Sequence, residues 1–212
     1  MQRYLPVDSI VAFEPMRANV RLLETNIARG PRPDRVRVYP VALSDRTERE
    51  LLQVDDMTDG SSRLDRLAPG QSTGGRLLSG QRGRTAWVES VTLDEIVERD
   101  QLPAATVIKI DVEGAEALVL QGARRTLRRD QPDLVISLHD DQAAAKSLLL
   151  LDELGYHCCS YVRDRTGQVH YARLTSANLN SLVSNNTVAS TVLSRVAEPP
   201  EDLDFDRLTW NL

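Results

Sequence analysis

The sequence predicts an α/β fold with an open, mostly parallel sheet, and three observations support this prediction. Short apolar strands alternate with amphipathic helices, beginning with residues 9–13 and the helix that follows them. Residues 106–110 and 133–138 are almost continuously apolar, as buried parallel strands are. Residues 156–162 and 168–174 flank a turn and predict a C-terminal antiparallel hairpin. Such a succession is typical of a sheet covered by helices.

The other elements follow from local signals. The first helix carries an apolar face and ends at Gly30, while 35–41 predicts a second strand that continues into an exit loop at 42–45. Further extended pieces are expected at 50–54 and 87–91, and Thr92 with Glu95 has the spacing of a capping box for a helix over 93–99. Two later helices present apolar faces made of Ala115, Leu118, Val119, Gly122 and Ala123, and of Ala144, Ser147, Leu148 and Leu151.

The length of 212 residues suits one domain, which we place at 1–175. Glycines are frequent in 55–86, which we interpret as a long flexible loop or insertion. Residues 176–212 show no periodic pattern and are interpreted as a C-terminal extension.

Composition limits the function classes. The net charge of −5 argues against nucleic acid and anionic membranes as main partners. The two cysteines, Cys158 and Cys159, are adjacent and form no disulfide framework, so we expect a reducing cytoplasmic location. No apolar run is long enough to span a bilayer.

Polar residues stand at the ends of the predicted strands. Glu14, the stretch 42–45, Asp111 and His139 each follow a strand. In open α/β sheets, ligands bind outside the carboxyl ends of the strands. We therefore expect these residues to lie along one edge, where a ligand would bind.

The order of the motifs resembles one enzyme family. The segments I-V-A-F-E-P (10–15), V-A-L-S-D (41–45), G-S-S-R-L (60–64) and V-T-L-D-E-I (91–96) lead to K-I-D-V-E-G-A-E (109–116) and D-L-V-I-S-L-H (133–139). This succession, over roughly 9–160, resembles the FkbM methyltransferases. The resemblance implies a Rossmann-like class I methyltransferase sheet and S-adenosylmethionine as the cofactor.

The resemblance assigns roles to the residues at the strand ends. Glu14 matches the carboxylate that binds the cofactor's ribose, although it would equally suit a cap of the following helix. Ala42, Leu43 and Ser44 match the loop near the adenine, where backbone contacts are expected rather than side-chain contacts; the alternative is a plain turn.

Asp111 matches a position near the methyl-donor end and is a candidate for orienting the substrate or acting as a base. The alternative is that Asp111 caps the next helix, with Glu113 and Glu116 as acids of its first turn. His139 is a candidate base, or a hydrogen-bonded loop histidine. Nothing in the sequence requires a metal, and none is expected.

The sequence departs from the family at its start. Such enzymes begin with a strand and a glycine-rich loop of the D-x-G-A-N-x-G kind, whereas residues 1–8 contain no glycine and are too few for that unit. In the family's sheet this strand lies between the strands that end at Glu14 and Asp111. Without it the two flanking strands would either pair with each other directly or leave unpaired edges, which invite a partner chain or a second copy.

Three explanations stay open: a fragment, which we favour, a half-site completed by another chain, or a domain that has lost catalysis. The first hypothesis for function is O-methylation of a small-molecule or sugar hydroxyl. The second is a non-catalytic binding module that pairs with a partner chain. A dinucleotide-binding oxidoreductase is disfavoured because it also needs a glycine-rich turn.

Overall fold

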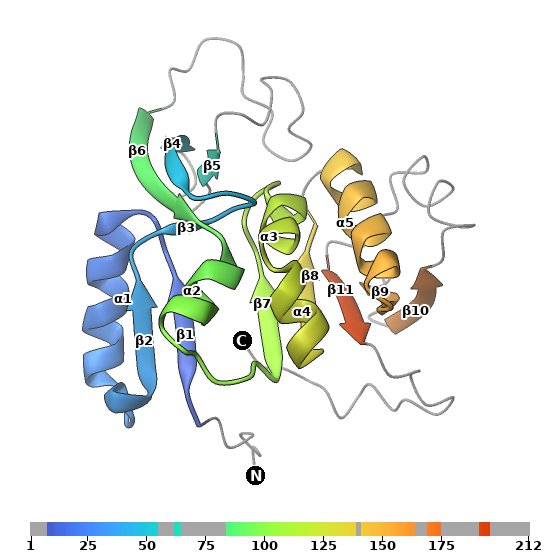
Figure 1. The fold of residues 1–212 in the computed structure, drawn as a ribbon, viewed down its shortest axis with the longest axis horizontal. Coiled ribbons are helices and arrows are strands. Elements are labelled where there is room, and N and C mark those ends of the chain that lie inside the picture. The colour runs from blue at the N-terminus through green and yellow to red at the C-terminus, as the bar shows by residue number, and fades with distance from the viewer. Residues whose placement is uncertain are drawn as a thin grey trace.

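The structure is a computed structural model that describes residues 8–54, 62–64, 84–138, 141–163, 169–174 and 191–195. It is a mixed α/β fold. Figure 1 shows the strands β2, β1, β7, β8, β11, β9 and β10 side by side from left to right, with β3, β4, β5 and β6 gathered at the upper left of β7. Within the described residues these strands form three separate sheets.

The first unit is a parallel pair with its crossover helix. Strand β1 (Ile10–Phe13) is followed by helix α1 (Arg17–Arg29), the short 3-10 helix η1 (Pro33–Arg35) and strand β2 (Val36–Tyr39). The two strands pair parallel, with Phe13 opposite Tyr39. A right-handed crossover through a helix is the usual connection of such a pair. The predicted strand–helix–strand order is confirmed here.

The prediction of an exit loop at 42–45, after the second strand, is wrong in one respect. Residues Ala42–Leu43 form a short strand, β3, which leaves β2 and pairs parallel with β6 (Arg84–Val91). Strand β4 (Glu48–Val54) then pairs antiparallel with β6 and with β5 (Ser62–Leu64). The change of sheet was not visible in the sequence, because a two-residue strand has no periodicity.

Helix α2 (Leu93–Arg99) has the predicted bounds. The Thr92 hydroxyl accepts the hydrogen bond of the Glu95 backbone N–H, as an N-cap residue does. In a complete capping box the Glu95 carboxylate would accept a hydrogen bond from the Thr92 backbone N–H. Here this carboxylate accepts a hydrogen bond from the Thr47 hydroxyl.

The largest sheet combines parallel and antiparallel pairs. Strand β7 (Val107–Ile110) pairs parallel with β8 (Asp133–Ser137), and between them the chain forms α3 (Glu116–Gly122) and α4 (Arg124–Asp130). Helix α5 (Asp141–Glu153) leads to the antiparallel hairpin of β9 (His157–Arg163) and β10 (Val169–Leu174), which confirms the predicted hairpin.

A strand that the sequence pattern did not predict lies between β8 and β9. Strand β11 (Thr191–Arg195) is antiparallel to both of them. It comes from the region interpreted as a C-terminal extension without regular pattern. Together with the antiparallel ribbon of β4, β5 and β6, it makes the architecture mixed rather than mostly parallel as predicted.

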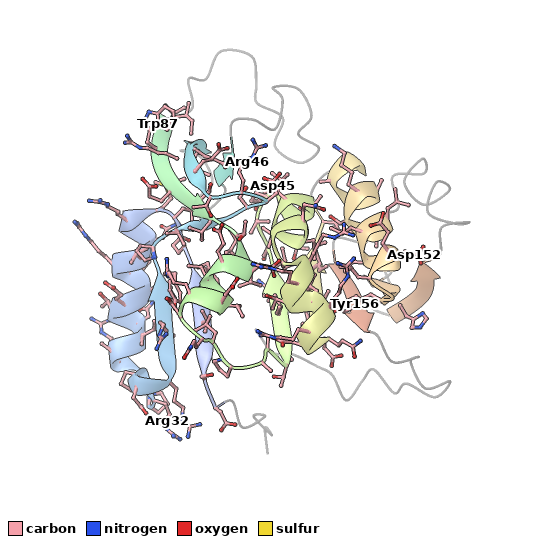
Figure 2. The ribbon with its side chains drawn as sticks, viewed as in Figure 1. Arg32, Asp45, Arg46, Trp87, Asp152 and Tyr156 are labelled. Carbon is pink, nitrogen blue, oxygen red and sulfur yellow. The ribbon has the colours of Figure 1, made fainter. Side chains whose placement is uncertain are left out.

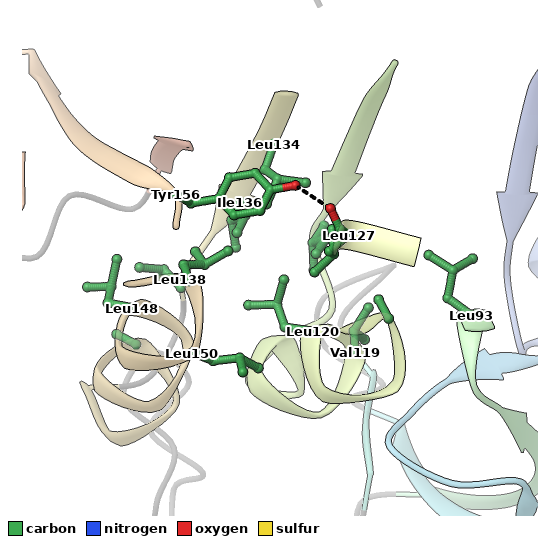
Figure 3. Packing of buried hydrophobic residues seen from close by; sticks show 14 of the residues in the cluster. Leu93, Val119, Leu120, Leu127, Leu134, Ile136, Leu138, Leu148, Leu150 and Tyr156 are labelled. Carbon is green, nitrogen blue, oxygen red and sulfur yellow. Dashed lines mark hydrogen bonds between the residues drawn. The ribbon is translucent and has the colours of Figure 1, made fainter. Parts of the chain in front are cut away.

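The main core lies between α3, α4, α5 and the strands β7 and β8. Its buried residues include Leu120, Leu127, Leu134, Ile136 and Leu151. Figure 3 shows Tyr156 beside Ile136, with its hydroxyl donating a hydrogen bond of 3.4 Å to the Leu127 carbonyl. The apolar face predicted for α5 points into this core, since Ala144, Ser147, Leu148 and Leu151 are all buried. The face predicted for α3 is divided, because Val119 and Ala123 join this core while Ala115 and Leu118 pack in a second cluster.

Contacts at one end of β2 dock the β1–α1–β2 unit onto this core. The Phe13 ring packs against the main core and stacks on Tyr39, with 5.3 Å between ring centroids. The Tyr39 hydroxyl donates a 2.5 Å hydrogen bond to Asp100 at the end of α2. The Arg99 guanidinium, together with this hydroxyl, lowers the pKa of Asp100 to about 2.

Two parallel strands have an edge without a partner strand among the described residues. Within the described ranges, β1 pairs with β2 alone and β7 pairs with β8 alone, and β1 and β7 do not pair with each other. Figure 1 draws β1 and β7 as neighbouring strands of the two sheets, with no strand between them. Ile10 is 47% exposed and Val107 is 46% exposed. The expectation of a buried strand at 106–110 is therefore wrong except at Ile110, because Val107 and Lys109 are exposed and Ile108 is half-buried.

Candidate functional site

The carboxyl ends of the parallel strands lie at one edge of the molecule. In Figure 1, β1, β2, β7 and β8 all run upward, and Figure 2 places Asp45 and Arg46 on that upper side. Glu14 follows β1 directly, and Asp111 follows β7 directly. The structure thus brings Glu14, Asp111 and the loop after β3 to the same edge, as the strand-end pattern predicts.

The half-buried side chain of Glu14 has a defined orientation. Its Oε1 accepts a 2.7 Å hydrogen bond from the backbone N–H of Met16, the residue that precedes α1. The Glu14 N–H donates to the Tyr39 carbonyl over 3.1 Å, which extends the β1–β2 pairing by one residue. Glu14 thus binds the N–H of the residue just before α1, while α1 itself has no side-chain cap hydrogen bond. A carboxylate has about four lone-pair sites, so this hydrogen bond does not exhaust its capacity to accept others.

Strand β3 and the first residue of the loop after it turn their side chains inward. Ala42 and Ser44 are buried, and Leu43 packs against the main core. The Ser44 N–H donates to the Val91 carbonyl over 2.9 Å, and its hydroxyl donates to Asp45 over 3.4 Å. Ser44 is fully buried and Ala42 is 7% exposed, so contact of this segment with a ligand stays a prediction.

Asp45 is the residue of this loop that offers a polar side chain to solvent. Its carboxylate is 23% exposed and lies 3.5 Å from the Arg46 guanidinium. The sequence placed Asp45 in the loop but did not distinguish it from its neighbours. The signal that could have done so is the apolar and small character of 42–44, which suits burial better than Asp45 does.

Asp111 lies at the surface and is paired with a lysine. Its side chain is 41% exposed, and Oδ2 is 2.8 Å from the Lys109 ammonium. The two residues are two positions apart, so they project from the same side of the strand end. Their exposure leaves Asp111 accessible to a bound molecule, with Lys109 as a nearby positive charge.

The turn after Asp111 is unusually constrained. Glu113 and Gly114 both have positive φ angles, 50° and 97°. The Gly114 N–H donates a 3.0 Å hydrogen bond to Oε1 of Glu116. Glu116 is an acid of the first turn of α3, as the alternative expected, and it is completely buried. Its burial follows from this turn, which the linear sequence does not reveal.

The predicted candidate base His139 is not among the described residues, so its prediction stays untested. Cys158 and Cys159 belong to β9, but their side chains lie outside the described set. Within the residues that the structure describes, no three His, Cys, Asp or Glu side chains are grouped to hold a metal ion. No helix in that same part of the chain is long and apolar enough to cross a membrane.

Comparison with known proteins gives one family match. The family model described as the methyltransferase FkbM domain matches residues 2–158, which is well over half of the chain. The crystal structure of the methyltransferase FkbM from Methylobacillus flagellatus KT is 18% identical, with a TM-score of 0.49. That match covers 89% of this chain and 36% of that chain, so this chain spans about a third of the solved protein. No curated protein matches the sequence.

Proposed function

The chain belongs to the FkbM methyltransferase family, and from this premise we propose that it is an S-adenosylmethionine-dependent methyltransferase that methylates a hydroxyl of a small molecule or sugar. The observation that carries the proposal is the Glu14 carboxylate, half-buried and oriented by the Met16 N–H at the common edge of the strands. We interpret the two parallel strand pairs as parts of a Rossmann-like arrangement, in which this edge takes the ligand.

The residues of the edge suit different parts of the cofactor. Glu14 would accept hydrogen bonds from the ribose hydroxyls, and the backbone of Ala42 to Ser44 would face the adenine. Asp111 would lie near the reacting methyl group. The cofactor supplies an electrophilic methyl group, and the chain supplies position and acid–base help. Asp111 or His139 is the proposed acceptor of the proton that the substrate hydroxyl loses.

Substitutions of Glu14 can separate its hydrogen bond to Met16 from its proposed binding of the ribose. Glu14→Gln keeps an oxygen that can accept the Met16 N–H, but it loses the negative charge and one acceptor. We expect it to weaken S-adenosylhomocysteine binding by about tenfold to a hundredfold, because hydrogen bonds to a charged group contribute about 1.5–3 kcal/mol. Isothermal titration measures the affinity. Glu24→Gln, an exposed change on α1, serves as the matched control.

Equal affinities of Glu14→Gln and the parent would contradict the ribose assignment. In that case Glu14→Ala should still lower the stability, by about 1 kcal/mol, because it removes the hydrogen bond to Met16 at the start of α1. Loss of stability without loss of affinity would mean that Glu14 serves only to accept the hydrogen bond from Met16.

A second candidate function is a non-catalytic binding module that pairs with a partner strand. The observation in its favour is the pair of edges on β1 and β7, which carry the half-exposed Ile10 and Val107. Backbone groups on an unpaired edge can template pairing with another chain. Because β1 and β7 each pair parallel on their other side, an extended apolar segment lying between them would suit both.

Charge placed on the edge tests this alternative. Val107→Lys should reduce any concentration-dependent association seen by analytical ultracentrifugation, since lysine on an edge opposes strand pairing. Leu149→Lys changes a residue of α5 that is 52% exposed and should leave association unchanged. A chain that stays monomeric at every concentration and binds S-adenosylhomocysteine would contradict the binding-module function.

A further inference from the structure

Helix α3 contacts both loops of the proposed cofactor edge. Its first residue, Glu116, holds the turn that follows Asp111, and its last residue, Gly122, lies against the loop that follows β3. Between them Val119 and Leu120 are buried in the main core, where α3 packs against α5. The helix is thus anchored independently of the two loops that it contacts.

The contact at Gly122 is made by backbone alone. A Cβ atom at this position would lie 1.9 Å from the Ser44 carbonyl oxygen and 3.3 Å from the Cα of Asp45. Neither atom belongs to a flexible side chain, so no rotamer change relieves the clash. Ser44 is fully buried and is fixed on its other side by the hydrogen bond to Val91. A larger residue at 122 must therefore displace either the loop or the helix.

The contact at Glu116 fixes a turn of high conformational cost. A non-glycine residue with positive φ, here Glu113, is uncommon and is held by its surroundings. The hydrogen bond from Gly114 to the buried Glu116 carboxylate closes this turn. The direction in which the chain leaves β7, and with it the position of Asp111, therefore depends on the first residue of α3.

We infer that α3 sets the relative position of the loop 42–45 and the turn 111–114, and that Gly122 and Glu116 are positioning residues of the edge. The effect on a ligand rests on the proposed function, because it assumes that the cofactor contacts both segments. The positioning of the two segments by α3 rests only on the contacts of Gly122 and Glu116. A small misplacement of groups that act on one ligand has a large effect on binding and rate.

The experiment compares Gly122→Ala, Glu116→Ala and Glu116→Gln in the full chain. Amide hydrogen exchange by NMR reports on the Ser44 and Gly114 N–H groups, and isothermal titration reports S-adenosylhomocysteine affinity. Ile136→Val is the control, because it trims a fully buried residue of β8 in the main core. It lowers overall stability while leaving the Gly122–Ser44 contact and the Gly114–Glu116 hydrogen bond in place. Global stability, measured for each variant, is used to separate local from global exchange.

We expect Gly122→Ala to speed exchange at Ser44, and Glu116→Ala to speed exchange at Gly114, each by about tenfold or more relative to the control. Affinity should fall about tenfold or more in both. Glu116→Gln retains an acceptor for the Gly114 N–H and should preserve most of the protection and affinity. A merely structural role would not produce these site-specific changes or the rescue by glutamine.

Exchange at Ser44 and Gly114 that matches the control in both alanine variants would overturn the inference. If Gly122→Ala does not fold, the comparison of Glu116→Ala with Glu116→Gln decides the matter. If the parent chain does not bind S-adenosylhomocysteine, the proposed function fails for this chain, while the exchange data still decide whether α3 positions the two segments.

Discussion

Asp94 of α2 caps a different helix, and its removal should destabilise the protein. Its Oδ1 accepts hydrogen bonds from the backbone N–H and the hydroxyl of Thr126, both at 2.8 Å, and its Oδ2 accepts from the Arg125 N–H at 2.9 Å. Ala123, the N-cap residue of α4, provides no side-chain cap. The Asp94 side chain is only 11% exposed, so water replaces these hydrogen bonds poorly.

The magnitude follows from two losses in Asp94→Ala. Removing an N-cap costs about 0.5–2 kcal/mol. The Thr126 hydroxyl, in a residue that is buried, would lose its partner, which adds about 1 kcal/mol or more. We therefore expect the free energy of unfolding to fall by about 2–3 kcal/mol. In a domain of this size that corresponds to a melting temperature lower by roughly 5–10 °C.

Urea unfolding followed by circular dichroism measures the change, with the slope against urea expected to stay constant. Glu98→Ala is the control, because Glu98 also meets Arg125, at 3.1 Å, but through an exposed ion pair. Such pairs contribute about 0–1 kcal/mol, so the control should lose little stability. A loss below about 0.5 kcal/mol in Asp94→Ala would refute the capping argument.

Two further predictions concern the contact between β2 and α2. Tyr39→Phe keeps the stacking on Phe13 but loses the hydrogen bond to Asp100, and should lower the free energy of unfolding by about 1 kcal/mol in urea melts; no change would mean that stacking alone docks this unit. The pKa of Asp100 is lowered to about 2, chiefly by Arg99, so its ionised form stabilises the fold above an unfolded-state pKa near 4. This contribution should disappear as the pH falls toward 2, and Asp100→Asn should flatten that part of the stability–pH curve. A parallel curve for the variant would contradict it.

The sequence predicted elements whose signals are local. Helix α2 begins where Thr92 can accept the N–H three residues later, and the structure contains that hydrogen bond. The apolar repeat of α5 points into the core, and Gly155 follows the helix with a φ of 79°, which glycine adopts without strain. Both signals lie within a few residues, so no knowledge of the rest of the chain is needed.

The sequence did not predict features that depend on distant neighbours. Strand β11 is defined by its pairing with β8 and β9, and its five residues show no alternation. The exposure of Val107 depends on what lies beside β7, since its apolar character fits a buried strand equally well.

The residues of the candidate site were predicted from the strand ends, but the contacts that hold these residues in place were not. Glu14 and Asp111 were placed at the edge because parallel strands end together there. Glu116 resembles any acid in a first helical turn, and Gly122 resembles any small residue of an apolar face. Their contacts, to Gly114 and to the backbone of Ser44, arise only when α3 packs between the two loops.

The most direct test of the central claim is isothermal titration of the purified 212-residue chain with S-adenosylhomocysteine, with circular dichroism to show that the chain is folded. We expect saturable binding to one site at micromolar concentrations, through the edge formed by Glu14, the segment 42–45 and Asp111. A folded chain that shows no binding would contradict the proposal that this polypeptide alone holds the cofactor.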